Sequence, residues 1–162
     1  MVLCLGPFHH LLEESERLDL LSACAEMTRP MGYVLASFKT KYGKLREVVS
    51  EDINHIFKEH AFYRNWISTG RFTVGDGPPV FHTDVRELQR MVSEVPILAA
   101  DIAACDIAFG GPLRNVFSSA APDTRAALLN LTLPLARDGS VLGASDKLLV
   151  VARKKTRIYQ SK

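Results

Sequence analysis

The chain opens with the residues MVLCLGPFHH, at positions 1–10. A run of short apolar residues stops at Gly6-Pro7 and is followed at once by an aromatic residue and by His9 and His10. A strand that is buried on both faces of a parallel sheet has such an uninterrupted apolar pattern, and open α/β sheets bind ligands just beyond the carboxyl ends of their strands. The stretch therefore predicts a core strand with a candidate site at its exit.

Residues 1–40 have the pattern of a βαβ unit. The segment 11–29 carries apolar residues at helical spacing, and its charged residues, Arg17 among them, fall on the other face. Pro30 cannot continue this helix, and 33–38 is a second apolar strand of the buried type. Because strand, helix and strand follow one another with short links, we expect the two strands to be parallel.

Residues 41–80 are expected to form a lid-like helix and a loop. The periodicity of 44–57 predicts an amphipathic helix, which together with Tyr42 is a candidate lid over a substrate, although its apolar stripe fits core packing equally well. An aromatic-rich link at 62–66 leads into 68–79. The glycines and prolines of this last segment predict an exposed loop.

Residues 81–152 are expected to contain two helices and the remaining strands. Thr83 or Asp84 caps the first helix, since Glu87 stands three residues after Asp84 as in a capping box. Its predicted buried stripe consists of Val85, Leu88, Met91, Val92 and Val95. The other expected elements are one or two strands within 97–108, a helix at 123–133 that Pro134 ends or kinks, and a last strand at 148–152.

Composition limits the class of protein. Of the 162 residues, 47% are apolar and 23% are charged, which is typical of soluble globular domains, and the net charge of +2 favours no nucleic acid. We expect the basic cluster in the tail, 153–162, to be solvated; a contact with nucleic acid is the alternative. No apolar stretch reaches the roughly 18 residues of a membrane span, and the opening run lacks the flanks of a signal peptide.

The three cysteines, Cys4, Cys24 and Cys105, are widely spaced and lie among apolar neighbours. This pattern predicts buried, reduced thiols and hence a cytoplasmic protein, rather than a disulfide framework or a zinc site. The adjacent His9 and His10 have no third ligand nearby in the sequence, so we expect no metal there.

Three motifs follow one another along the chain: Leu-Cys-Leu-Gly-Pro-Phe-His-His-Leu-Leu at 3–12, Arg-Pro-Met-Gly at 29–32 and Leu-Gly-Ala-Ser at 142–145. In this order they resemble the C-terminal half of a class I S-adenosylmethionine-dependent methyltransferase domain of the small-molecule type. The first motif is similar to the family's fourth strand and its loop, and the second to the turn before its fifth strand. Phe-His-Thr-Asp at 81–84 resembles a segment that opens the next helix. The resemblance spans nearly the whole chain.

This resemblance implies an α/β fold: a partial Rossmann-like sheet of the family's strands 4 to 7 with flanking helices, its last strand antiparallel and inserted between its two predecessors. It implies methyl transfer from S-adenosylmethionine to a small-molecule acceptor. His10 occupies the family's recurring histidine position and is the candidate catalytic residue, accepting a proton from the acceptor, although solvent contact or capping is the alternative. The residues expected to border the cofactor are Leu5, Gly6 and Pro7. Those expected to line the substrate pocket are Phe8, His9, Tyr42, Phe81 and His82, with capping and packing the alternative for the last two.

The chain also departs from the family's pattern. It has no Gly-x-Gly-x-Gly turn, which lets the backbone approach the cofactor, and Gly110-Gly111-Pro112 stands in a different context. At 94–96, Glu-Val-Pro replaces the family's Ala-Gly-Phe turn. We therefore expect a truncated domain without its N-terminal cofactor-binding half and with little or no activity alone. The alternative is a non-catalytic interaction or regulatory remnant, whose exposed first strand pairs with a partner or with itself.

Overall fold

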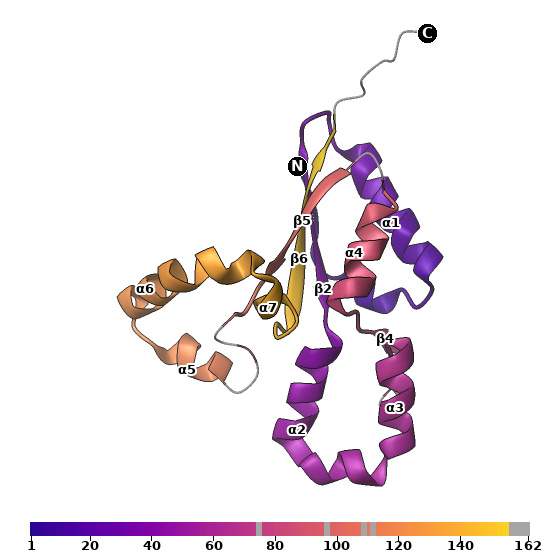
Figure 1. Ribbon diagram of the computed structural model, residues 1–162, viewed down its shortest axis with the longest axis vertical. Helices are drawn as coiled ribbons and strands as arrows, with labels where there is room; N and C mark the ends of the chain where they lie inside the picture. The colour runs from indigo at the N-terminus through magenta and orange to yellow at the C-terminus, as the bar shows by residue number, and fades with distance from the viewer. Residues whose placement is uncertain (74–75, 96–97, 108–109, 111–112, 156–162) are drawn as a thin grey trace.

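The computed structural model describes residues 1–155 apart from 74–75, 96–97, 108–109 and 111–112. Its centre is a four-stranded mixed sheet with helices on both faces, which places the chain in the α/β class (Figure 1). The strand order is β1-β2-β6-β5; β1 and β2 are parallel, and β6 is antiparallel to both β2 and β5. The last strand, β6, thus lies between β2 and β5, the two strands of this sheet that come before it in the chain, as the resemblance implied. The strands are β1 (Val2–Cys4), β2 (Tyr33–Lys39), β5 (Leu98–Ala104) and β6 (Lys147–Lys154).

The first two strands and helix α1 (Glu14–Met27) form the expected βαβ unit, and the parallel pairing of β1 with β2 is confirmed. A short 3-10 helix, η1 (Pro7–His10), follows β1, and α1 begins later and ends earlier than the expected range of 11–29. The turn into β2 is tight at Gly32, whose amide donates to the Arg29 carbonyl at 2.9 Å. A Cβ at this position would lie 2.8 Å from that same oxygen, so only glycine fits.

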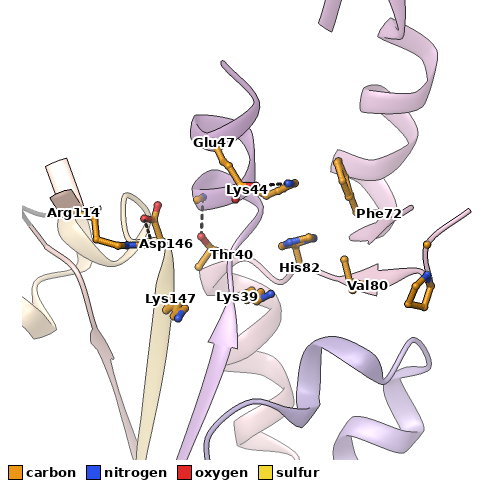
Figure 2. Close-up of a pocket in the computed structure, with 13 residues that line it drawn as sticks. Lys39, Thr40, Lys44, Glu47, Phe72, Val80, His82, Arg114, Asp146 and Lys147 are labelled. Atoms are coloured by element: carbon orange, nitrogen blue, oxygen red, sulfur yellow. Dashed lines mark hydrogen bonds and ion pairs between the residues drawn. The ribbon is translucent and has the colours of Figure 1, made fainter. Parts of the chain in front are cut away.

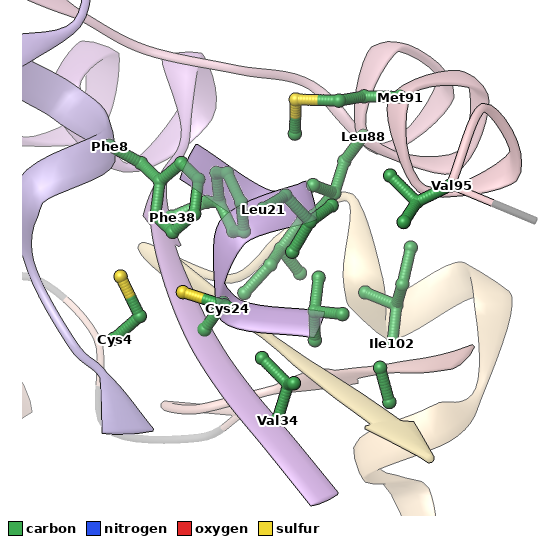
Figure 3. Packing of buried hydrophobic residues seen from close by; sticks show 14 of the residues in the cluster. Cys4, Phe8, Leu21, Cys24, Val34, Phe38, Leu88, Met91, Val95 and Ile102 are labelled. Atoms are coloured by element: carbon green, nitrogen blue, oxygen red, sulfur yellow. The ribbon is translucent and has the colours of Figure 1, made fainter. Parts of the chain in front are cut away.

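The hydrophobic core lies between the sheet and helices α1 and α4 (Figure 3). Helix α4 (Val85–Ser93) begins as predicted at Asp84, whose carboxylate accepts a hydrogen bond from the Glu87 amide at 3.0 Å. The predicted stripe of α4 is confirmed, since all five of its residues are buried or packed against this core. The largest buried side chains include Phe8, Leu21, Val34, Phe38, Leu88, Leu148 and Val150.

The opposite face carries the helices between β5 and β6 (Figure 1). Among the described residues of 97–108 the structure has one strand, β5, and the helix expected at 123–133 is found as α6. Helix α6 ends at Thr132, and Pro134 lies in the first turn of the 3-10 helix that follows, where its fixed φ is tolerated. Helix α5 was not expected, although Leu113, Val116 and Phe117 stand at helical spacing, and none of its residues is buried. These elements are α5 (Leu113–Ser119), α6 (Pro122–Thr132), η2 (Leu133–Arg137) and α7 (Gly139–Leu142).

Helices α2 (Lys41–Lys58) and α3 (His60–Thr69) form a hairpin that projects beyond the end of the sheet (Figure 1). The expectation of a link at 62–66 is wrong: these residues belong to α3, and Tyr63 and Trp66 pack with Val48 and Phe72 in a second hydrophobic cluster. A short strand within the predicted loop pairs antiparallel with a second one just after it, while residues 74–75 lie outside the described part. These strands are β3 (Arg71–Phe72) and β4 (Val80–Phe81).

Two expectations about burial are wrong. Cys105 is exposed, because it lies just beyond the end of β5, whereas Cys4 and Cys24 are buried. Arg17 is only 3% exposed rather than solvated, because β4 and α4 cover that side of α1. Its guanidinium lies 3.5 Å from the centre of the Phe81 ring and 3.6 Å from a Glu87 carboxylate oxygen.

Strand β1 stands at one edge of the described sheet, where it pairs with β2. Leu3 and Leu5 expose 57% and 59% of their surface, so this edge is apolar as well as open. Of the basic tail, β6 takes in Arg153 and Lys154, and residues 156–162 lie outside the described part. None of the described helices is both long and apolar enough to cross a membrane.

Candidate functional site

A cavity of about 540 Å³ lies where the carboxyl end of β2 meets the amino end of β6 (Figure 2). Ligands of open α/β sheets bind at this end of the parallel strands. Its walls come from the end of β2, the first turns of α2, the β3–β4 ribbon, α5 and the start of β6. The lining residues with side chains that bear on the chemistry are Lys39, Thr40, Lys44, Glu47, Phe72, Val80, His82, Arg114, Asp146 and Lys147.

The join between α2 and β6 is held by Thr40 and Gly43. The Thr40 hydroxyl accepts a hydrogen bond from the Gly43 amide at 2.9 Å and donates one to the Ser145 carbonyl at 2.6 Å. The same hydroxyl therefore caps α2 and links this helix to Ser145, the residue before Asp146. A Cβ on Gly43 would lie 2.5 Å from the Asp146 Cα, so the absence of a side chain allows this close approach.

Four cationic and two anionic side chains line the cavity. Both carboxylates are paired: Glu47 lies 2.6 Å from the Lys44 ammonium, and Asp146 forms ion pairs with Arg46 and, at 3.5 Å, with Arg114. The side chains of Lys39 and Lys147 have no ion-pair partner within the described ranges. The cavity therefore carries an excess of positive charge, concentrated where β2 and β6 meet.

His82 lies between the lysines and the apolar wall formed by Phe72 and Val80 (Figure 2). It is 3% exposed, and its ring meets those of Trp66 and Phe72 edge-on at centroid distances of 5.8 and 5.7 Å. Its Nδ1 atom is buried without a hydrogen-bond partner in the described part of the chain. Burial, and then the positive charges of Lys39, Lys44 and His9, lower the pKa of His82 to about 4, so its ring is neutral at pH 7.

The two histidines that the sequence analysis singled out lie in η1, at the exit of β1. His10 is exposed and His9 is partly buried, with their ring centroids 3.9 Å apart. Burial lowers the pKa of His9, and the positive charges of Lys39, His10 and Lys147 lower it further. His9 therefore lies within electrostatic reach of the lysines of the cavity, although neither histidine is among its lining residues.

The other predicted site residues are not brought together. Phe8 is 1% exposed and packs on Phe38 in the core, with ring centroids 4.3 Å apart. Phe81 is buried under Arg17, and Tyr42 is 47% exposed, its ring 5.4 Å from the Arg46 guanidinium. Among the residues predicted to line a substrate pocket, His82 is the one that lines this cavity.

At the predicted cofactor border, Leu5 and Pro7 are exposed and Gly6 has a φ of 147°. This conformation is accessible to glycine and strained for residues with a side chain. No atom lies within 4 Å of the place that a Cβ on Gly6 would occupy, so the backbone at the exit of β1 is open to an approaching molecule.

The lysines of the cavity were not predicted from the sequence. Lys39 and Lys147 each stand at the end of an apolar strand, and a charged residue at a strand end is ordinarily solvated. One feature of the sequence could have indicated Lys39: it stands at the carboxyl end of a strand that was expected to be parallel to its neighbour, and ligands bind at such strand ends. Within the described ranges, no group of three or more histidine, cysteine or acidic residues is arranged to hold a metal ion.

The chain matches no family model, and no curated protein matches it. The site is therefore defined by its own geometry: a cationic cavity with one apolar wall and a buried, neutral histidine, beside the exit of the first strand.

Proposed function

We propose that this chain forms the part of a class I S-adenosylmethionine-dependent methyltransferase domain that holds a small-molecule acceptor. The observation that carries the proposal is the sheet order β1-β2-β6-β5 with β6 antiparallel to both of its neighbours. This is the order that the family resemblance implies for strands 4 to 7, and sequentially adjacent strands more often lie side by side. A cavity at the carboxyl end of β2 supports the same proposal.

The residues at the exit of β1 fit the edge of a cofactor site. Gly6 leaves open space beside the backbone, and the exposed Leu5 offers an apolar contact. When bound, S-adenosylmethionine supplies an activated methyl group, so the protein needs to provide proximity, alignment and exclusion of water rather than a covalent nucleophile. We propose, from the family resemblance, that His10, exposed in η1 at the exit of β1 and outside the lining of the cavity, accepts a proton from an acceptor hydroxyl or amine.

Titration with S-adenosylhomocysteine, followed by amide chemical shifts, tests this proposal. We expect saturable shifts at the amides of Leu5, Gly6 and Phe8, with a dissociation constant in the millimolar range, about −4 kcal/mol. The affinity is weak because the sequence has no glycine-rich turn to hold the rest of the cofactor. Saturation without shifts at the exit of β1 would contradict the proposal.

Two glycine variants provide the matched comparison. Gly6→Ala forces the exit of β1 out of its φ of 147° and is expected to weaken the response at least threefold. Gly139→Ala is the control, because a Cβ there meets no atom within 4 Å and the residue begins α7, away from this exit. Thermal unfolding of both variants establishes that each remains folded.

The open, apolar edge at β1 favours a second candidate, a non-catalytic interaction module. Leu3 is more than half exposed on an edge strand with free backbone donors and acceptors, which is a template for pairing with another strand. We expect sedimentation at micromolar concentration to give species larger than 18.0 kDa, and Leu3→Lys to restore the monomer. A sharp monomeric boundary for the unmodified chain would exclude self-pairing. Self-association of a chain that shows no response to S-adenosylhomocysteine would favour the interaction module over the methyltransferase.

A further inference from the structure

Two lysines stand directly opposite each other at the mouth of the cavity. In the antiparallel register of β2 and β6, Lys39 is the cross-strand partner of Lys147, and both side chains line the cavity. Like charges in this arrangement repel one another and destabilise the pairing of the strands. No carboxylate within the described ranges pairs with either side chain, so the repulsion is not offset by an ion pair.

A second feature of the same cavity is a buried polar atom without a partner. The Nδ1 atom of His82 makes no hydrogen bond in the described part of the chain, although the side chain is 97% buried and lines the cavity. Buried polar groups in folded proteins nearly always have partners, so an ordered water or a ligand is expected to complete this one. As a neutral imidazole, the ring offers one N–H donor.

From these observations we infer that the cavity binds a small amphipathic oxyanion, with its carboxylate or phosphate held by Lys39, Lys147 and His82 and its apolar body against Phe72 and Val80. The carboxylates of Glu47 and Asp146 do not oppose an anion, because each is already neutralised by a paired cation. We assign this oxyanion as the methyl acceptor. That assignment rests on the proposed function, whereas the inference that the cavity binds an oxyanion does not.

The experiment compares benzoate and phenyl phosphate with the neutral benzamide. Trp66 is the single tryptophan of the chain, and its ring centroid lies 5.8 Å from that of His82, so its fluorescence reports on the cavity. We expect benzoate or phenyl phosphate to change the emission saturably and to bind at least tenfold more tightly than benzamide. Raising the salt concentration from 50 to 500 mM is expected to weaken the two anions and not benzamide. The better of the two anions identifies the preferred headgroup.

Three single substitutions separate the site from general charge effects. Lys39→Gln and Lys147→Gln are each expected to weaken benzoate binding at least fivefold, while Lys58→Gln, at the exposed end of α2, leaves it unchanged. Because either cavity substitution removes a repulsion between like charges, both variants are expected to be at least as stable as the parent chain, so a loss of binding is not a loss of folding.

Equal affinity for benzamide and benzoate, or unchanged binding in both cavity variants, would overturn the inference. If the anions do not bind but S-adenosylhomocysteine shifts the amides at the exit of β1, the proposed function stands and only the inferred oxyanion site is wrong. If the anions bind but those amide shifts are absent, the oxyanion site stands and the proposed function is wrong.

Discussion

Replacing Arg17 by methionine is expected to lower the free energy of unfolding by about 3–5 kcal/mol, the cost of removing one partner of a buried ion pair. The Arg17 guanidinium donates hydrogen bonds to the carbonyls of Leu11 and Leu12 at 2.8 and 2.9 Å and covers the Phe81 ring. Without it, both carbonyls lose a charged donor, and Glu87 loses one of its two ion-pair partners in the described chain while keeping the Lys41 ammonium at 3.9 Å and the Thr83 hydroxyl at 3.3 Å. Denaturant unfolding measures the change.

Arg86→Met is the matched control, because Arg86 is an exposed arginine near the start of α4. We expect it to change stability by less than about 0.5 kcal/mol. Adding Glu87→Gln to Arg17→Met is expected to recover part of the loss, since it removes a carboxylate that has lost one of its two cationic partners. A loss below about 1 kcal/mol in Arg17→Met would mean that the side chain is solvated in solution, as its place in the helical pattern indicated.

Acidification is expected to destabilise the protein through His82. The pKa of this residue is about 4 in the folded chain, against an ordinary value of 6.5, because burial and the positive charges of Lys39, Lys44 and His9 disfavour the imidazolium. Between these two pH values the unfolded chain binds a proton that the folded chain does not. The free energy of unfolding therefore rises with pH across this window and is constant, as far as His82 is concerned, above it. From pH 7 to pH 4 the loss is about 3 kcal/mol.

The measurement is the free energy of unfolding at several pH values from 4 to 7, for the parent chain and for His82→Gln. Other groups titrate in this range, so the contribution of His82 is the difference between the two pH profiles. His60→Gln, at an exposed histidine that begins α3, is the control and is expected to keep the parent profile. Identical profiles for the parent chain and His82→Gln would show that the buried ring takes up its proton at an ordinary pH.

Local patterns were sufficient for the elements that depend on a few neighbouring residues. The βαβ unit follows from apolar runs and a proline, and the start of α4 follows from Asp84 and Glu87, three residues apart. Helix α3 was missed for a physical reason. Its Tyr63 and Trp66 pack against Phe72, which a turn of the chain brings back to them, so the partner that stabilises the helix is not visible in its own periodicity.

The candidate site depends on contacts that no local pattern contains. Lys39 and Lys147 are separated by more than a hundred residues and become neighbours because β6 inserts beside β2. Arg17 is buried because segments more than sixty residues away cover it.

Apolar runs, helical periodicity and capping therefore determine where most of the strands and helices form, since they act over a few residues. Which charges meet at the end of the sheet, and which lose contact with water, is decided by strand insertion and helix packing, because burial and electrostatic repulsion depend on distance in space rather than along the chain.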